Sequence, residues 1–275
     1  MESECYYHNT CHGLESLSID EDSLHNAAFP LLHKQLATLQ LLRIYNYERG
    51  GVGVSIQANK IEALSTFLFP NLTILYLDRI SSMLSQKLDS LIKQTPNLEK
   101  LFLNTVYNVP NGIFQCLLLL PRFSTLSMTE VEFDAHDLYQ CLKGFSQRQV
   151  ESSSGYLTHL SLSMCLINNA IMNVATKIQT LTNLDVSMFD IDGTPTDKAV
   201  MNFVEHITQL PKLNTLGISC WRIKMDHIQI LSRCTSLRKI SLWLMEDVNE
   251  SQVRQAFSSD VQVEFYNWKN RWLFY

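Results

Sequence analysis

The pattern L-x-x-L-x-L recurs nine times along the 275 residues of the chain, and this repetition constrains the fold more than any other feature. Its first positions are residues 14, 39, 72, 98, 123, 157, 181, 213 and 237. Successive copies lie 24 to 26 residues apart in five cases and 32 to 34 residues apart in three. A repeat of this period predicts a solenoid, in which each unit buries its apolar face only by stacking on its neighbours.

Each unit has room for one strand and one helix. The alternating L-x-L segment suits a strand whose apolar side chains all point to one face. Apolar residues then recur at helical spacing in 82–94 and in 167–178, which predicts helices there. The chain is therefore expected to place strands and helices in alternation.

This spacing resembles that of the leucine-rich-repeat family, of the ribonuclease-inhibitor-like type, over residues 13–257. The resemblance implies an α/β horseshoe with a parallel concave sheet and convex helices. The unit from Leu157 to Cys165 comes closest to the family pattern, whereas apolar residues such as Ile80, Val106 and Val131 replace the usual asparagine or cysteine elsewhere. We therefore expect apolar packing to hold those turns.

Three further segments complete the predicted organisation. Residues 1–12 form an N-terminal tail, and residues 258–275 form a C-terminal cap with a strand at 261–265 followed by an aromatic stretch. The extra residues of the three long units lie at 46–57, 146–155 and 190–198, where glycine, serine and proline predict loops.

Net charge, cysteine content and the absence of known motifs limit the kinds of function to expect. The formal net charge of −5 disfavours a nucleic acid as partner, and no apolar stretch approaches the ~20 residues of a membrane-spanning helix. Seven cysteines, an odd number spread over the chain, favour reduced thiols in the cytoplasm or nucleus. No nucleotide-binding, metalloprotease or serine-hydrolase motif is present. We therefore expect neither an enzyme nor a cofactor or metal site.

The concave surface is the candidate binding site. Side chains between the inward leucines must point out of the sheet, and on three consecutive strands these are large or polar. The predicted partner-binding residues are Arg43, Tyr45, Tyr76, Asp78, Phe102 and Asn104, with Trp243 as a second centre in the C-terminal half. Aromatic residues and arginine beside polar groups are typical of binding hot spots. The alternative is that strands simply favour aromatic residues.

Among intracellular families, these repeats are similar to those of substrate receptors of cullin-RING ubiquitin ligases, of the F-box or the Zyg/Zer kind. The unit Leu157–Cys165 resembles the former, and Leu181–Ser187 with its long spacer resembles the latter. This resemblance implies a protein client on the concave face and a ligase adaptor bound through a segment outside this chain. The alternative function is a scaffold or inhibitor with no link to ubiquitin.

Overall fold

The computed structural model describes residues 13–20, 28–46, 64–80, 82–151, 156–187, 196–219, 223–242 and 248–265. The predicted N-terminal tail and Trp243 lie outside these residues, as does the aromatic stretch after Phe265.

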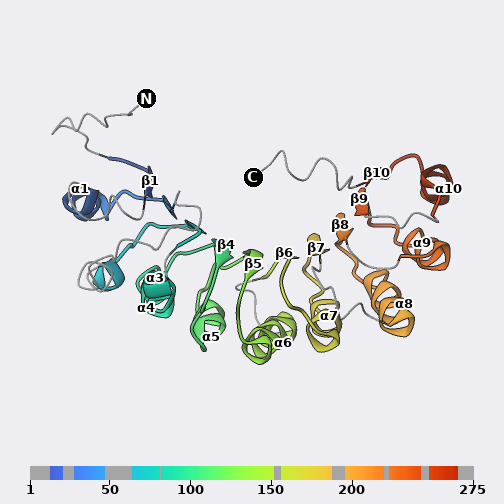
Figure 1. The fold of residues 1–275 in the computed structure, drawn as a ribbon, viewed down its shortest axis with the longest axis horizontal. Coiled ribbons are helices and arrows are strands. Elements are labelled where there is room, and N and C mark those ends of the chain that lie inside the picture. The colour runs from blue at the N-terminus through green and yellow to red at the C-terminus, as the bar shows by residue number, and fades with distance from the viewer. Residues whose placement is uncertain are drawn as a thin grey trace.

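The described residues form a leucine-rich-repeat solenoid built on a single parallel sheet of ten strands. The strands are hydrogen-bonded in chain order, β1 to β10, and curve into an arc with the helices along its outer side (Figure 1). The tenth strand is the one predicted at 261–265. The strands are β1 (Ser16–Asp20), β2 (Leu41–Tyr45), β3 (Ile74–Asp78), β4 (Lys100–Val106), β5 (Thr125–Val131), β6 (His159–Ser163), β7 (Asn183–Ser187), β8 (Thr215–Ser219), β9 (Lys239–Leu242) and β10 (Gln262–Phe265).

Each pair of consecutive strands from β3 on is separated by one helix, or by two between β3 and β4, and the helices range from 4 to 17 residues. They are α1 (Ala28–Gln35), α3 (Ser82–Ser85), α4 (Leu88–Lys93), α5 (Ile113–Leu118), α6 (Ala135–Glu151), α7 (Asn169–Ala175), α8 (Asp197–Ile207), α9 (Met225–Leu231) and α10 (Glu250–Ala256). Side-chain caps stabilise several helix starts. For example, the carboxamide oxygen of Asn168 accepts a hydrogen bond from the Ile171 amide at 3.0 Å.

The core lies between sheet and helices, and the repeat register places it there. Leu160, Leu184 and Leu216 face one another across β6, β7 and β8, as do Leu162, Val186 and Ile218. Each of these six side chains is at most 2% exposed. The prediction that the apolar side chains of the strands point to one face is therefore confirmed.

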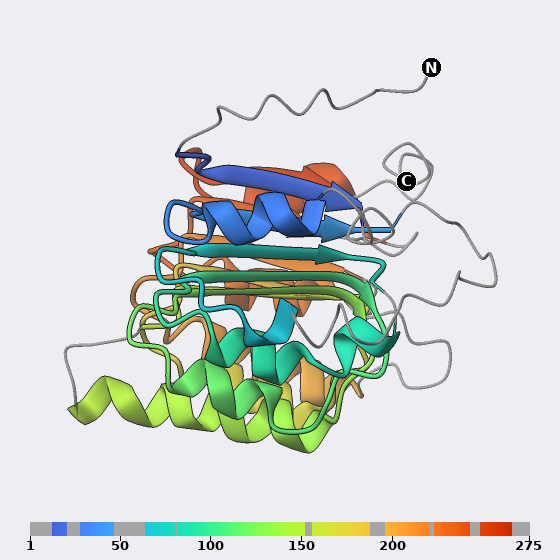
Figure 2. The ribbon, with the colours of Figure 1, turned by 90° about the vertical axis from the view of Figure 1, so that its left-hand side faces the viewer.

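One helix prediction and one loop prediction need correction. The helix expected over 82–94 is divided into α3 and α4 by a turn at 86–87. Residues 146–151, expected in a loop, instead extend α6, which reaches beyond its neighbours (Figure 2). No glycine or proline interrupts residues 145–151, so the helix continues until the Ser-Ser-Ser-Gly run. The remainder of the three insertions lies outside the described residues, apart from the ends at Asn46 and 196–198.

Apolar residues hold the turns after the strands, as expected from the missing asparagine ladder. Ile80, Val106, Val131 and Cys165 are all at most 5% exposed. The residue before each adopts the left-handed conformation, with φ between 50° and 55°, at Arg79, Thr105, Glu130 and Met164. None of these four is glycine, so the buried residue that follows must hold the backbone in a conformation that L-residues rarely adopt.

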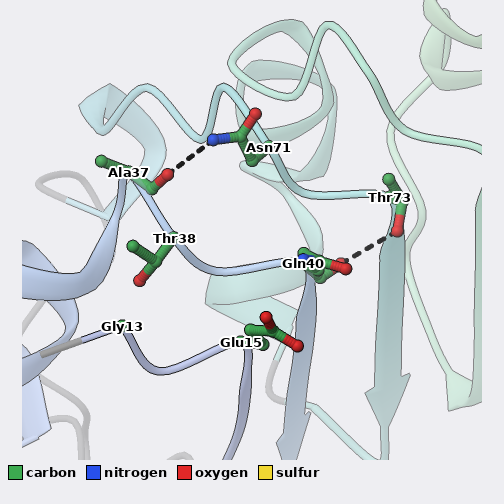
Figure 3. Close-up of a pocket in the computed structure, with 7 residues that line it drawn as sticks. All are labelled: Gly13, Glu15, Ala37, Thr38, Gln40, Asn71 and Thr73. Carbon is green, nitrogen blue, oxygen red and sulfur yellow. Dashed lines mark hydrogen bonds between the residues drawn. The ribbon is translucent and has the colours of Figure 1, made fainter. Parts of the chain in front are cut away.

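The opposite rim, before the strands, is held by polar groups. The Asn71 side chain donates to the Ala37 carbonyl at 2.5 Å, and the Thr73 hydroxyl donates to the Gln40 carbonyl at 3.2 Å (Figure 3). Asn97 donates in the same way to Pro70, at 2.6 Å. These bonds join consecutive units, so the shallow hollow that Figure 3 shows at this rim is a junction between repeats.

Candidate binding surface on the concave sheet

The register brings six of the seven predicted residues together on strands β2, β3 and β4. Arg43, Tyr76 and Phe102 are paired across the three strands and form one row on the concave face. Tyr45, Asp78 and Asn104 form the next row. We call these six residues the aromatic cluster. The seventh predicted residue, Trp243, lies outside the described residues, so its place relative to the cluster is not assigned.

The first row is a continuous stack. The rings of Tyr76 and Phe102 are stacked, with centroids 5.7 Å apart and planes inclined by 24°. The guanidinium carbon of Arg43 lies 4.7 Å from the centroid of the Tyr76 ring and 5.6 Å from that of Tyr45. Offset aromatic pairs and cation–π contacts each contribute about 1 kcal/mol. The three side chains therefore hold one another in place on the sheet.

Asp78 sits beneath this stack and is 4% exposed. Its carboxylate accepts a hydrogen bond from the Asn104 amide at 2.7 Å, and it pairs with Arg79 at 3.3 Å and with Arg43 at 3.7 Å. This burial differs from the expected exposed position, because Asp78 lies in the row nearest the turn at the end of β3. Asp78 therefore links Arg43, Arg79 and Asn104 in one polar group.

Sequence reasoning missed two members of the surface. Leu41 and Ile74 are paired across β2 and β3, next to Lys100 on β4, and both are only half-buried. Each comes immediately before an inward-facing leucine and so belongs to the concave side, like Arg43 and Tyr76. The signal was available, because alternation along the strand assigns Leu41 and Ile74 to the outward face. The apolar part of the surface therefore comprises Leu41, Ile74, Tyr76 and Phe102.

The C-terminal half of the concave face combines small side chains with two acids, Asp185 on β7 and Glu264 on β10. Ser161, Asp185 and Gly217 continue the row that contains Arg43, Tyr76 and Phe102. The Ser161 hydroxyl donates to the Asp185 carboxylate over a long 3.4 Å, while the other carboxylate oxygen is buried and accepts no hydrogen bond from any residue that the structure describes. Burial raises the pKa of Asp185, which the Ser161 hydrogen bond only partly offsets.

The described thiols serve packing. Cys116, Cys141, Cys165 and Cys234 are free and buried, and burial raises the pKa of Cys165 to about 11. A thiol in this state is a poor nucleophile, because the thiolate is the reactive form. Within the described ranges, no three of the histidine, cysteine, aspartate and glutamate side chains are grouped so that they could hold a metal ion. No helix in the same ranges has the length and apolar character to span a membrane.

Comparison with known proteins finds a similar structure but no matching sequence family or curated protein. No family model matches the sequence, and no curated protein matches it. A solved structure, the crystal structure of a TLR13–ssRNA13 complex, is similar with a TM-score of 0.44 and 15% identity, over 92% of this chain and 32% of that chain. This chain therefore spans under a third of that protein's length. The assignment of the fold rests on the strand pairing described above, and the function must be argued from the surface itself.

Proposed function

We propose that this solenoid is a protein-recognition module and that the N-terminal half of its concave face is the principal binding surface. The observation that carries the proposal is the stack of Arg43, Tyr76 and Phe102, which lies on the face of the sheet opposite the core. Inward leucines already fill the core beneath these strands, so the three side chains have no core to enter.

Such a cluster has the composition of a binding hot spot. Aromatic residues and arginine contribute most of the binding energy at protein interfaces, because they combine a large contact area with few rotatable bonds. The Arg43 side chain is 44% exposed although it contacts two rings. The order imposed by the stack and by Asp78 lowers the entropy lost when a partner binds.

The test is affinity purification from cells with the wild-type chain and four variants as bait. Tyr76→Ala and Phe102→Ala remove the stack, whereas Ser161→Ala and Ser241→Ala change the C-terminal half of the same face. Proteins that the serine variants retain and the aromatic variants lose, with all four variants folded, support the proposal. The opposite pattern would move the site to the C-terminal half, where Trp243→Ala is the next variant.

We further propose that the client is held for a cullin-RING ubiquitin ligase, with this chain as its substrate-recognition part. The support is the resemblance of the repeats at 157–165 and 181–187 to those of such receptors. Co-purification of a cullin and its adaptor with the full-length gene product tests this step. A client that binds without any cullin would favour the alternative, a scaffold or inhibitor that acts outside ubiquitin transfer.

A further inference from the structure

We infer that the aromatic cluster recognises a protein segment in which a carboxylate lies close to an apolar side chain. The inference rests on the proposed function and adds the chemistry of the partner group. It is carried by donors on neighbouring strands that make no hydrogen bond to any described residue and by the apolar side chains beside them.

Three donors on consecutive strands make no hydrogen bond within the described part of the chain. They are the guanidinium of Arg43, the hydroxyl of Tyr76 and the ammonium of Lys100. Arg43 touches the Asp78 carboxylate only at 3.7 Å, which is beyond hydrogen-bond length. Among the described residues, its planar set of N–H groups has no hydrogen-bond acceptor, and we assign that acceptor to the partner.

The guanidinium is also prepared for a carboxylate. The rings of Tyr45 and Tyr76 lie within 6 Å of its central carbon and cover part of the side chain, which is 44% exposed, and the Asp78 carboxylate lies 3.7 Å away. Arginine held in this way suits a carboxylate, because two parallel N–H groups match its two oxygens.

The local charge has the sign that an acidic partner requires. Strands β2–β4 and the turn after β3 contain three cationic side chains and one carboxylate. The cations are Arg43, Arg79 and Lys100, and the carboxylate is Asp78. Arg43 and Lys100 each lie at an outward position next to a buried leucine, so these two cations face the concave side. The whole chain, in contrast, carries a net charge of −5. A cationic surface on an acidic protein selects acidic partners through complementarity.

The apolar side chains set the spacing within the partner. Phe102 lies two strands from Arg43, which is about 10 Å across the sheet. An extended segment that crosses the strands covers this distance in about three residues. We therefore expect an aspartate or glutamate, or a C-terminal carboxylate, about three positions from a large apolar residue that packs on Phe102, Ile74 and Leu41.

The test is selection of a random twelve-residue peptide library against four folded proteins. These are the wild-type chain, Arg43→Gln, Arg43→Lys and Phe102→Ala. The wild-type pool should be enriched in an acid about three residues from an apolar side chain. The Arg43→Gln pool should keep the apolar residue and lose the acid, and the Phe102→Ala pool should show no enrichment. Selected peptides should bind Arg43→Gln at least tenfold more weakly, and Arg43→Lys should recover little of this loss.

Synthesis of the selected peptides as free acids and as amides separates the two carboxylate sources. A loss on amidation indicates a C-terminal carboxylate, and an unchanged affinity indicates a side chain; both outcomes fit the inference. Peptides that need Phe102 but show no acid preference would overturn the inference and leave the proposed function standing. Peptides that bind Phe102→Ala as well as wild type, or no enrichment over that variant, would overturn both.

Discussion

A side chain at Gly217 would collide with the carboxylate of Asp185. The two residues are paired across β7 and β8, and a Cβ atom built at Gly217 would lie 2.5 Å from Oδ1 of Asp185. The absence of a side chain at Gly217 is therefore what lets the aspartate lie across the sheet. Glycine is needed here for a close approach rather than for an unusual backbone angle.

The first prediction concerns this pair. Gly217→Ala should lower the free energy of unfolding by about 1 to 3 kcal/mol, because the added methyl group must displace the carboxylate. In an Asp185→Ala background the same change should cost much less, since the space is then open. Urea denaturation of wild type, the two single variants and the double variant measures the coupling between the two sites. Equal costs of Gly217→Ala in both backgrounds would show that Asp185 does not occupy this space.

The second prediction is a dependence on pH. Burial raises the pKa of Asp185 in the folded chain, so the folded state binds the proton more tightly than the unfolded state does. The resulting stabilisation is fully present below the unfolded-state pKa and is lost as pH rises through the folded-state pKa. Asp185→Asn should therefore raise stability at pH 7 by about 1 kcal/mol, because it removes a buried charge.

The matched measurement is the free energy of unfolding of wild type and Asp185→Asn from pH 3 to pH 8. The difference between the two proteins should grow as pH rises from the acidic end and then level off. A constant difference, or a variant less stable than wild type at pH 7, would contradict the proposed ionisation of Asp185.

The fold could be predicted from the sequence because its main determinant is local and repeated. The pattern around Leu160 and Leu162 fixes which side chains enter the core, and the same register then holds at Leu184 and Leu216. A shift of one residue would expose every leucine of the strand, so the alternation leaves little freedom. For the same reason Arg43, Tyr76 and Phe102 could be assigned to one row.

What the sequence did not predict depends on distance and packing. Nothing in the pattern indicated that Asp78 would be buried under Arg43 and Arg79, because their contacts join neighbouring strands and a turn. The position of the Asp185 carboxylate depends on its close packing against Gly217, which is 32 residues further along the chain. One oxygen of this carboxylate has no hydrogen-bond partner among the described residues. We expected residues 146–151 in a loop because they precede a serine-rich run. They contain no strong helix-breaking residue, so they continue α6 instead.

The third prediction tests the core. Leu160→Ala and Leu216→Ala should each cost about 2 to 5 kcal/mol, because each opens a cavity between stacked units. Ser161→Ala, on the other face of β6, is the control and should change stability by less than about 1 kcal/mol. Thermal unfolding followed by circular dichroism makes the comparison. An unchanged midpoint for both leucine variants would show that the register is wrong.

The fourth prediction concerns the C-terminal edge. Strand β10 covers β9, and Val263 is 7% exposed while its carbonyl accepts a hydrogen bond from Arg254 at 2.8 Å. Truncation after Ser259 removes this strand and uncovers Ile240 and Leu242, so the shortened chain should aggregate. Size-exclusion chromatography of the truncated and full chains provides the readout. A monomeric truncated chain with native circular dichroism would mean that this segment serves a partner instead.

The most direct measurement is the dissociation constant of one purified partner for wild type, Tyr76→Ala, Phe102→Ala, Ser161→Ala and Ser241→Ala, each shown to fold normally. Loss of a central aromatic contact should weaken binding at least about thirtyfold. We therefore expect that loss for Tyr76→Ala and Phe102→Ala, and an affinity within about threefold of wild type for both serine variants. Unchanged affinity of both aromatic variants, with loss at either serine, would contradict a binding surface on β2–β4.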